Sequence, residues 1–300
     1  MEFSWSGRQL PYSPDMDGIG PLFYVAFAVL LVSGVVGNMS VVLMACCYGR
    51  VRTPAGLYVV NVAVADLLIC TFGVLLDPVS VLLRRWPFGV VLCYACSFSE
   101  HLGVFVHGYT LVVAAARFVA GAPPKPGSCH LNNVGVWFLG TVVCLPHMLL
   151  IDSRALAVHG QCVVKWPGTV KMLEPFVSFA AIAAFPFLLV TVSYAWLRAS
   201  LWLGRGTRRS FVRRASIVRV FWLMSLLLLL CRTPLHVTRC LLGVWTAMRA
   251  STHLTVVVLA TRAIAAAVVC FTAAFFFDLS AKQLSRRVRQ VPSVAANHGS

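Results

Sequence analysis

The stretch LYVVNVAVADLLICTFGVLL, residues 57–76, contains a single charged side chain, Asp66. A helix needs about 20 apolar residues to cross a hydrocarbon core of roughly 30 Å, because each residue advances it by about 1.5 Å. The stretch therefore predicts a helix that crosses a membrane. An aspartate at mid-membrane depth is costly and normally has a partner, an ion or water nearby.

The composition of the whole chain agrees with this prediction. Hydrophobic residues make up 59% of the 300 residues and charged residues 11%, and the mean hydropathy is +0.84. A soluble globular chain carries roughly a quarter charged residues. The protein therefore has too few charged side chains for a solvated surface of ordinary size.

Seven apolar runs of sufficient length occur, separated by short connectors with turn residues such as YGRVRTPAG. No second domain is apparent. The predicted spans are residues 22–47, 56–83, 90–120, 133–151, 171–203, 217–245 and 253–278. The sequence predicts an all-α membrane protein with an N-terminal tail at 1–21, a transmembrane domain at 22–278, and a cytoplasmic amphipathic helix and tail at 279–300.

The distribution of basic residues predicts the orientation, because cytoplasmic loops retain Lys and Arg during insertion. With the N-terminus outside, 15 of the 25 basic residues lie in inner segments and seven in outer ones. We therefore expect a multi-pass protein of the plasma membrane with an extracellular N-terminus. The net charge of +16 is better explained by anionic inner-leaflet lipid or an acidic cytosolic partner than by nucleic acid, because the basic residues flank apolar spans.

Most of the eleven cysteines lie within predicted helices, where a thiol is a small buried hydrophobe. Cys93 and Cys162 lie near the outer surface in separate segments. Both would face an oxidising compartment, so a disulfide between them is the natural pairing. Cys96, one helical turn from Cys93, is a competing partner that the sequence leaves open.

Short motifs mark six of the seven predicted helices. GNMSVV contains Asn38, VNVAVADLL contains Asp66, and WPFGVVLC ends at Cys93. Further landmarks follow in order: Trp137 and Pro146, Pro186 and Tyr194, and CRTP with Pro234. Taken together, this series resembles the rhodopsin-like, class A G-protein-coupled receptors over nearly the full chain. The resemblance implies a rhodopsin-type bundle of seven helices, and DLSAKQLSRRVRQ fits a short amphipathic eighth helix on the inner leaflet.

In the family, the acid at the position of Asp66 binds sodium and favours the inactive state, and Asn38 is its nearest candidate partner. The alternative is a polar contact between helices without an ion. The segment AAFFF, residues 273–277, stands where the family has Asn-Pro-x-x-Tyr, so nothing polar is expected there and the sodium site appears incomplete. No other cofactor and no metal site are expected.

The triplet ARF, residues 116–118, stands where the family has Asp-Arg-Tyr. The resemblance makes Arg117 the activation switch. Because Ala116 replaces the acid that restrains this arginine, we expect raised basal activity. Strict counting from Cys93 instead places Phe118 at the arginine position, and this alignment stays open.

Other positions complete the expected switch and the surface for a G protein. Pro186 and Pro234 remove backbone hydrogen bonds and kink their helices, which lets the inner halves move. Tyr194 is the family's tyrosine on helix 5. The residues expected to contact a heterotrimeric G protein are Arg117, Arg208, Arg209, Arg213 and Arg214.

The outer halves of the helices carry the expected ligand pocket. Glu100 stands where amine receptors keep their ligand-binding aspartate, and Arg232 replaces the family's toggle tryptophan. A buried pair between them would satisfy both charges. The surplus arginines then favour a carboxylate-bearing ligand, such as a lipid or the end of a peptide. The expected pocket residues are Asp77, Glu100, His101, Arg232, His236, Arg239 and Arg262.

No Ser, His and Asp set, metal-site spacing of histidines or phosphate-binding loop supports an enzyme. Two functional classes remain. One is a receptor that relays an extracellular or lipid-phase ligand to a G protein. The other is a receptor-shaped decoy, scavenger or homo- or heterodimer partner without ordinary coupling. Diverged receptors of herpesviruses also have altered switch triplets, and the sequence does not decide between a host and a viral origin.

Overall fold

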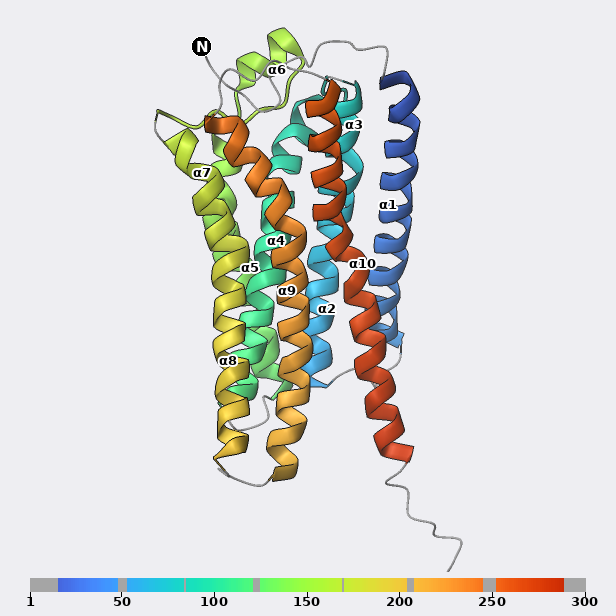
Figure 1. Ribbon diagram of the computed structural model, residues 1–300, viewed down its shortest axis with the longest axis vertical. Helices are drawn as coiled ribbons and strands as arrows, with labels where there is room; N and C mark the ends of the chain where they lie inside the picture. The colour runs from blue at the N-terminus through green and yellow to red at the C-terminus, as the bar shows by residue number, and fades with distance from the viewer. Residues whose placement is uncertain are drawn as a thin grey trace, which may run out of the picture.

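The computed structural model describes residues 16–47, 53–83, 85–120, 125–168, 170–203, 208–244 and 252–288. Within these ranges the chain forms a bundle of long helices that run side by side (Figure 1). The predicted all-α bundle with seven crossings is confirmed. The crossing segments are α1 (Met16–Cys47); α2, η2 and α3 (Pro54–Leu68, Ile69–Leu76, Asp77–Leu83); α4 (Gly89–Val119); α5 (Pro126–Leu149); α7, η3 and α8 (Val170–Phe179, Ala180–Ala184, Phe185–Trp202); α9 (Arg208–Val244); and α10 (Thr252–Val288).

Six of these segments are long and apolar enough to span a membrane, and α10 contributes the shorter apolar stretch Val256–Thr272. Their outer faces carry aliphatic and aromatic side chains, such as Val25 on α1 and Phe138 on α5, which are 62% and 72% exposed. Contiguous apolar surface of this kind marks contact with a membrane. The bundle therefore presents a lipid-facing exterior.

Several helix ends differ from the prediction. The first helix begins at Met16, before the predicted start at residue 22. α5 begins at Pro126 rather than at residue 133, because proline fits the first turn of a helix, where no hydrogen-bond donor is needed. The segment expected to form an eighth helix is helical, but it continues α10 to Val288 without a break. The first 15 residues of the expected N-terminal tail and the tail beyond 288 lie outside the described residues.

The central helix is α4, which packs against α2, α5, α8 and α9. Small residues allow this close approach, as is common between membrane helices. A Cβ atom added at Gly103 would lie 2.9 Å from the carbonyl oxygen of Ala65, and one at Gly140 of α5 would lie 2.9 Å from Leu102 and Phe105 of α4. These glycines bring both flanking helices against α4.

Two crossing segments contain π-helical turns. The first, η2, immediately precedes Asp77 and Pro78, and the second, η3, ends one residue before Phe185 and two before Pro186. Proline removes a backbone donor and favours such local departures from α-helical geometry. Pro186 therefore lies at an irregular point of its helix, as expected, and Pro234 lies inside α9.

The short helix α6 (Ser153–His159) lies at the end of the bundle where α1 begins, and we call this the α6 end (Figure 1). The disulfide between Cys93 and Cys162 is present and ties the α6 loop to the start of α4, so this prediction is confirmed. Cys96, the competing partner, instead donates to the carbonyl oxygen of Phe72. The loop thus forms a fixed cover over part of the α6 end.

Asp152 begins α6. Its carboxylate accepts hydrogen bonds from the backbone N–H groups of Ala155 and Arg154, and these bonds lower its pKa below the usual value. A lowered pKa means that the cap stabilises the fold at neutral pH and is lost as the pH falls through the folded-state pKa.

Candidate functional site

A cavity of about 190 Å³ opens at the α6 end. Five of the seven residues expected to bind ligand line it: Asp77, Glu100, His101, Arg239 and Arg262. The other two, Arg232 and His236, are buried in α9 beside it. The residues expected to bind ligand thus lie in or beside one cavity, and their role in ligand binding stays a prediction.

Two ion pairs neutralise four of the charged groups. Arg232 Nη1 lies 3.3 Å from Glu100 Oε1, so the pairing expected from the sequence is present. The Glu100 side chain packs on Gly73, where an added Cβ would lie 3.0 Å from Glu100 Cγ. Arg262 forms a second pair with Asp77. Both acids are thus engaged by protein, and neither is free to bind a cationic ligand.

Arg239 makes no hydrogen bond or ion pair with any other residue in the described ranges, and it faces the cavity. It interacts electrostatically with Glu174. A guanidinium that lines a concave site binds carboxylates well, because its planar fork donates two parallel hydrogen bonds. The cavity is therefore suited to an anionic group.

Among the cavity residues that the sequence analysis missed are His147 of α5, Trp166 of the α6 loop and Glu174 of α7. His147 stacks on His101 with ring centroids 3.8 Å apart, and Trp166 meets His147 edge to face at 5.2 Å. His147 Nε2 lies 3.6 Å from Glu174 Oε1. A charged residue inside the apolar run 171–203 was a signal that could have identified Glu174.

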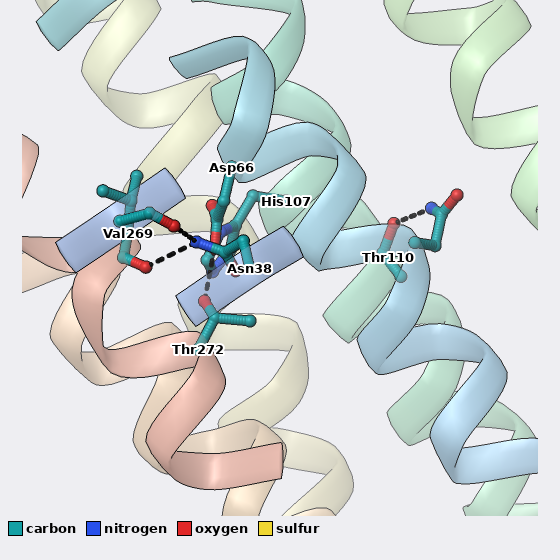
Figure 2. A network of polar contacts seen from close by, with 8 residues as sticks. Asn38, Asp66, His107, Thr110, Val269 and Thr272 are labelled. Atoms are coloured by element: carbon teal, nitrogen blue, oxygen red, sulfur yellow. Dashed lines mark hydrogen bonds and ion pairs between the residues drawn. The ribbon is translucent and has the colours of Figure 1, made fainter. Parts of the chain in front are cut away.

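A second polar cluster lies in the middle of the bundle (Figure 2). His107 of α4 donates through Nδ1 to Asp66 Oδ1 at 2.7 Å, and the hydroxyl of Thr272 in α10 donates to Asp66 Oδ2. Asn38 donates to the carbonyl oxygens of Gly34 and Val269, at 2.9 and 2.8 Å. The expectation that Asn38 is the partner of Asp66 was wrong: the partners are His107 and Thr272.

The residues of AAFFF carry no polar side chain, but Thr272, directly before them, supplies a hydroxyl that contacts Asp66 and that the sequence analysis did not single out. His107 lies seven residues after Glu100, two turns along the same face of α4. This spacing was the signal that a second buried polar group follows Glu100 toward the core.

The residues around Asp66 do not fit a sodium ion. Sodium is held by oxygen ligands, whereas the group directly against Asp66 Oδ1 is a ring nitrogen of His107, and the Thr272 hydroxyl points its proton at Oδ2. Asp66 and His107 are both essentially inaccessible to solvent. The imidazole N–H thus takes the place at the carboxylate that the resemblance assigned to an ion.

A neighbouring network joins three helices beside this cluster. Thr110 of α4 accepts a hydrogen bond from Asn61 of α2 at 2.8 Å (Figure 2). Trp137 of α5 in turn donates through Nε1 to Asn61 at 2.9 Å. A buried network whose members are satisfied rigidifies the helices that it joins. It fixes the rotation of α4 against α2 and α5.

That rotation determines which side chain faces α9 at the end of the bundle opposite α6. Phe118 is buried and packs against Phe221 of α9, with ring centroids 6.1 Å apart. Arg117 is exposed and donates to Asn132 of α5 at 2.9 Å. In the structure, therefore, Phe118 faces α9 and Arg117 faces α5. Which of the two acts as the switch stays a prediction.

The remaining switch and coupling residues lie on α8 and α9. Tyr194 stacks on Trp222 of α9, with ring centroids 5.8 Å apart. Arg213 is exposed on the first turns of α9, and the guanidinium of Arg214 lies 4.2 Å above the Phe211 ring. The side chains of Arg208 and Arg209 lie outside the described residues, although both belong to α9.

A bundle with seven crossings, a disulfide-bound loop and a polar cavity beneath it defines a seven-transmembrane receptor. The sequence matches the family described as 7 transmembrane receptor (rhodopsin family) over residues 37–272. The chain belongs to this family, and its relatives are receptors rather than enzymes.

Three relatives illustrate the similarity. The chain is 28% identical to somatostatin receptor type 4 of Rattus norvegicus over 258 residues, which cover 79% of the chain and 66% of the relative. It is 23% identical to the neuromedin-K receptor of Oryctolagus cuniculus, over 72% of the chain and 50% of that receptor. It is 26% identical to the substance-K receptor of Canis lupus familiaris, over 72% and 61%. The matched segment thus covers about half to two thirds of these receptors.

Proposed function

We propose that the protein is a G-protein-coupled receptor of the plasma membrane, with the N-terminus and the α6 end outside the cell. A ligand bound in the cavity at the α6 end shifts the bundle, and the opposite end, with the arginines of α9, engages a heterotrimeric G protein. The excess of basic residues in the segments at that opposite end supports this orientation.

The observation that carries the proposal is the charge pattern of the cavity. Asp77 and Glu100 are paired with arginines, whereas Arg239 has no such partner in the described ranges. The ligand therefore brings a carboxylate. Peptide termini and fatty acids both offer this group. The similarity to receptors for somatostatin, neuromedin-K and substance K favours a peptide ligand over a fatty acid.

Peptides with a free C-terminal carboxylate are expected to activate G proteins more strongly than their amidated forms. Arg239→Ala is expected to lower the potency of the carboxylate-bearing peptides by about 10- to 100-fold, because a hydrogen bond to a charged group contributes about 1.5–3 kcal/mol. Arg154→Ala, on the exposed face of α6, is the matched control. The measurement is dissociation of the G-protein heterotrimer in cells. Fatty acids, the other carboxylate-bearing candidates, are tested in the same assay. Equal potency of acid and amide forms would contradict the proposal.

One observation favours the second class, a receptor-shaped protein without ordinary coupling. Phe118 occupies the position that faces α9, where the family uses an arginine to engage its partner. An apolar ring there removes the charge of the switch. It also leaves α4 and α9 in an aromatic contact that needs no acid to hold it.

Basal G-protein activation separates the two classes. The receptor is expected to show raised basal activation, because neither Ala116 nor Arg117 supplies an acidic restraint before Phe118, and Arg117→Ala is expected to leave the signal nearly unchanged, since Arg117 contacts Asn132. The uncoupled protein is expected to show no activation with any ligand, and to gain it in Phe118→Arg. A basal signal abolished by Arg117→Ala would restore Arg117 as the switch.

A further inference from the structure

Three side chains at the α6 end form a cluster that the charge pattern of the cavity does not explain. His101 of α4, His147 of α5 and Glu174 of α7 each offer a ligating atom, and these three atoms lie within 4.8 Å of one another. Each comes from a different helix. We propose that they bind a divalent transition-metal ion, with zinc as the best fit.

The surroundings of the ring nitrogens in the two histidines support this assignment. His101 Nδ1 lies 2.8 Å from the carbonyl oxygen of Ser97, so it carries the proton and Nε2 keeps its lone pair. Metal-binding histidines commonly have this arrangement, in which a carbonyl fixes the tautomer. His147 has both ring nitrogens buried, and neither has a hydrogen-bond partner in the described part of the chain. Glu174 Oε1, 3.6 Å from His147 Nε2, is too far for a hydrogen bond but close enough to share a metal ion with the ring.

The geometry requires one small movement. The two rings stack at 3.8 Å with an interplanar angle of 27°, so their lone pairs do not yet converge. Zinc at about 2.0–2.1 Å from each ligand brings the ligand atoms closer together than they stand here. Turning the His147 ring about its side-chain bonds achieves this, and it breaks no hydrogen bond because that ring has none. Ser97 holds the His101 ring in place.

The ligand set selects the ion. Two imidazoles and one carboxylate are ligands typical of zinc sites with an open fourth position, whereas calcium and magnesium prefer oxygen ligands. The guanidinium of Arg239 opposes a cation here, and Glu174 offsets it. The open position faces the cavity, where water or an anionic ligand group can complete a tetrahedron. The ion would cross-link α4, α5 and α7.

Zinc binding is expected to raise the melting temperature of the full-length chain in lipid nanodiscs, whereas calcium and magnesium are expected to leave it unchanged. His147→Ala and Glu174→Gln are each expected to weaken zinc binding by at least about tenfold, which is the loss seen even for groups that only support a ligand. Glu174→His, which provides a third ligand where Glu174→Gln does not, is expected to recover zinc binding. The matched control is His159→Ala, on the exposed end of α6.

Cobalt titration gives a second readout that does not depend on stability, because a four-coordinate cobalt site absorbs visible light. The absorption is expected in the wild-type chain and in His159→Ala, and it is expected to be absent in His101→Ala combined with His147→Ala. A zinc-induced shift that persists in that double variant would place the ion elsewhere and overturn the proposal. So would a failure of Glu174→His to recover binding.

Discussion

Replacing His107 with alanine is expected to lower the free energy of unfolding by about 3–5 kcal/mol, the usual cost of breaking a buried pair. The change leaves Asp66 as a buried carboxylate with the Thr272 hydroxyl as its remaining donor. Unfolding of the purified protein in nanodiscs measures the loss. His159→Ala, which changes an exposed histidine of α6, controls for the substitution itself.

A double-mutant cycle tests the cause. Asp66→Asn combined with His107→Ala is expected to be less destabilised than the sum of the single variants, with a coupling energy of about 1–3 kcal/mol. Exchange of sodium for choline is expected to leave the wild-type melting temperature unchanged, because protein groups engage both carboxylate oxygens. Additive single effects, or a wild type stabilised by sodium, would contradict the assignment of His107.

Arg232→Ala is expected to have a comparable effect, about 3–5 kcal/mol, because Glu100 would be left as a largely buried charge without a partner. Arg232 is only 4% exposed, so water cannot replace it. Thermal unfolding measures the change. The charge-swapped variant, with Glu100→Arg and Arg232→Glu together, is expected to recover most of the loss.

The swap also separates structure from ligand binding. If Glu100 serves only the ion pair, the swapped variant keeps its response to carboxylate peptides, since Arg239 is untouched. A swapped variant that is stable but unresponsive would instead assign Glu100 a direct role in the ligand site. Gly73, which leaves room for the Glu100 side chain, is unchanged in every variant.

The features that the sequence predicted well have strong and simple causes. The seven crossings followed from apolar run length alone, because a bilayer admits few alternatives. The disulfide followed from the depth at which Cys93 and Cys162 lie. The pair of Glu100 and Arg232 followed from the cost of burying either charge unpaired. In each case one energetic term dominates.

The errors arose where the rotation of a helix decides the result. One residue along α4 turns a side chain by about 100°, so the choice between Arg117 and Phe118 depended on packing that a motif does not contain. The partner of Asp66 was assigned from the resemblance to the family, which pointed to Asn38. His107 contacts Asp66 only because close glycine contacts bring α4 against α2. Glu174 was hidden within an apolar run.

The π-helical turn η2 decides which way the side chains beyond it point at the α6 end. A π turn holds one more residue than an α turn. Wound as a regular α-helix, the same residues would turn Asp77 by about 100° about the helix axis and away from Arg262, its partner. The wider turn thus sets the direction of the side chains in the half of the segment nearer α6 independently of the half that lies deeper in the bundle.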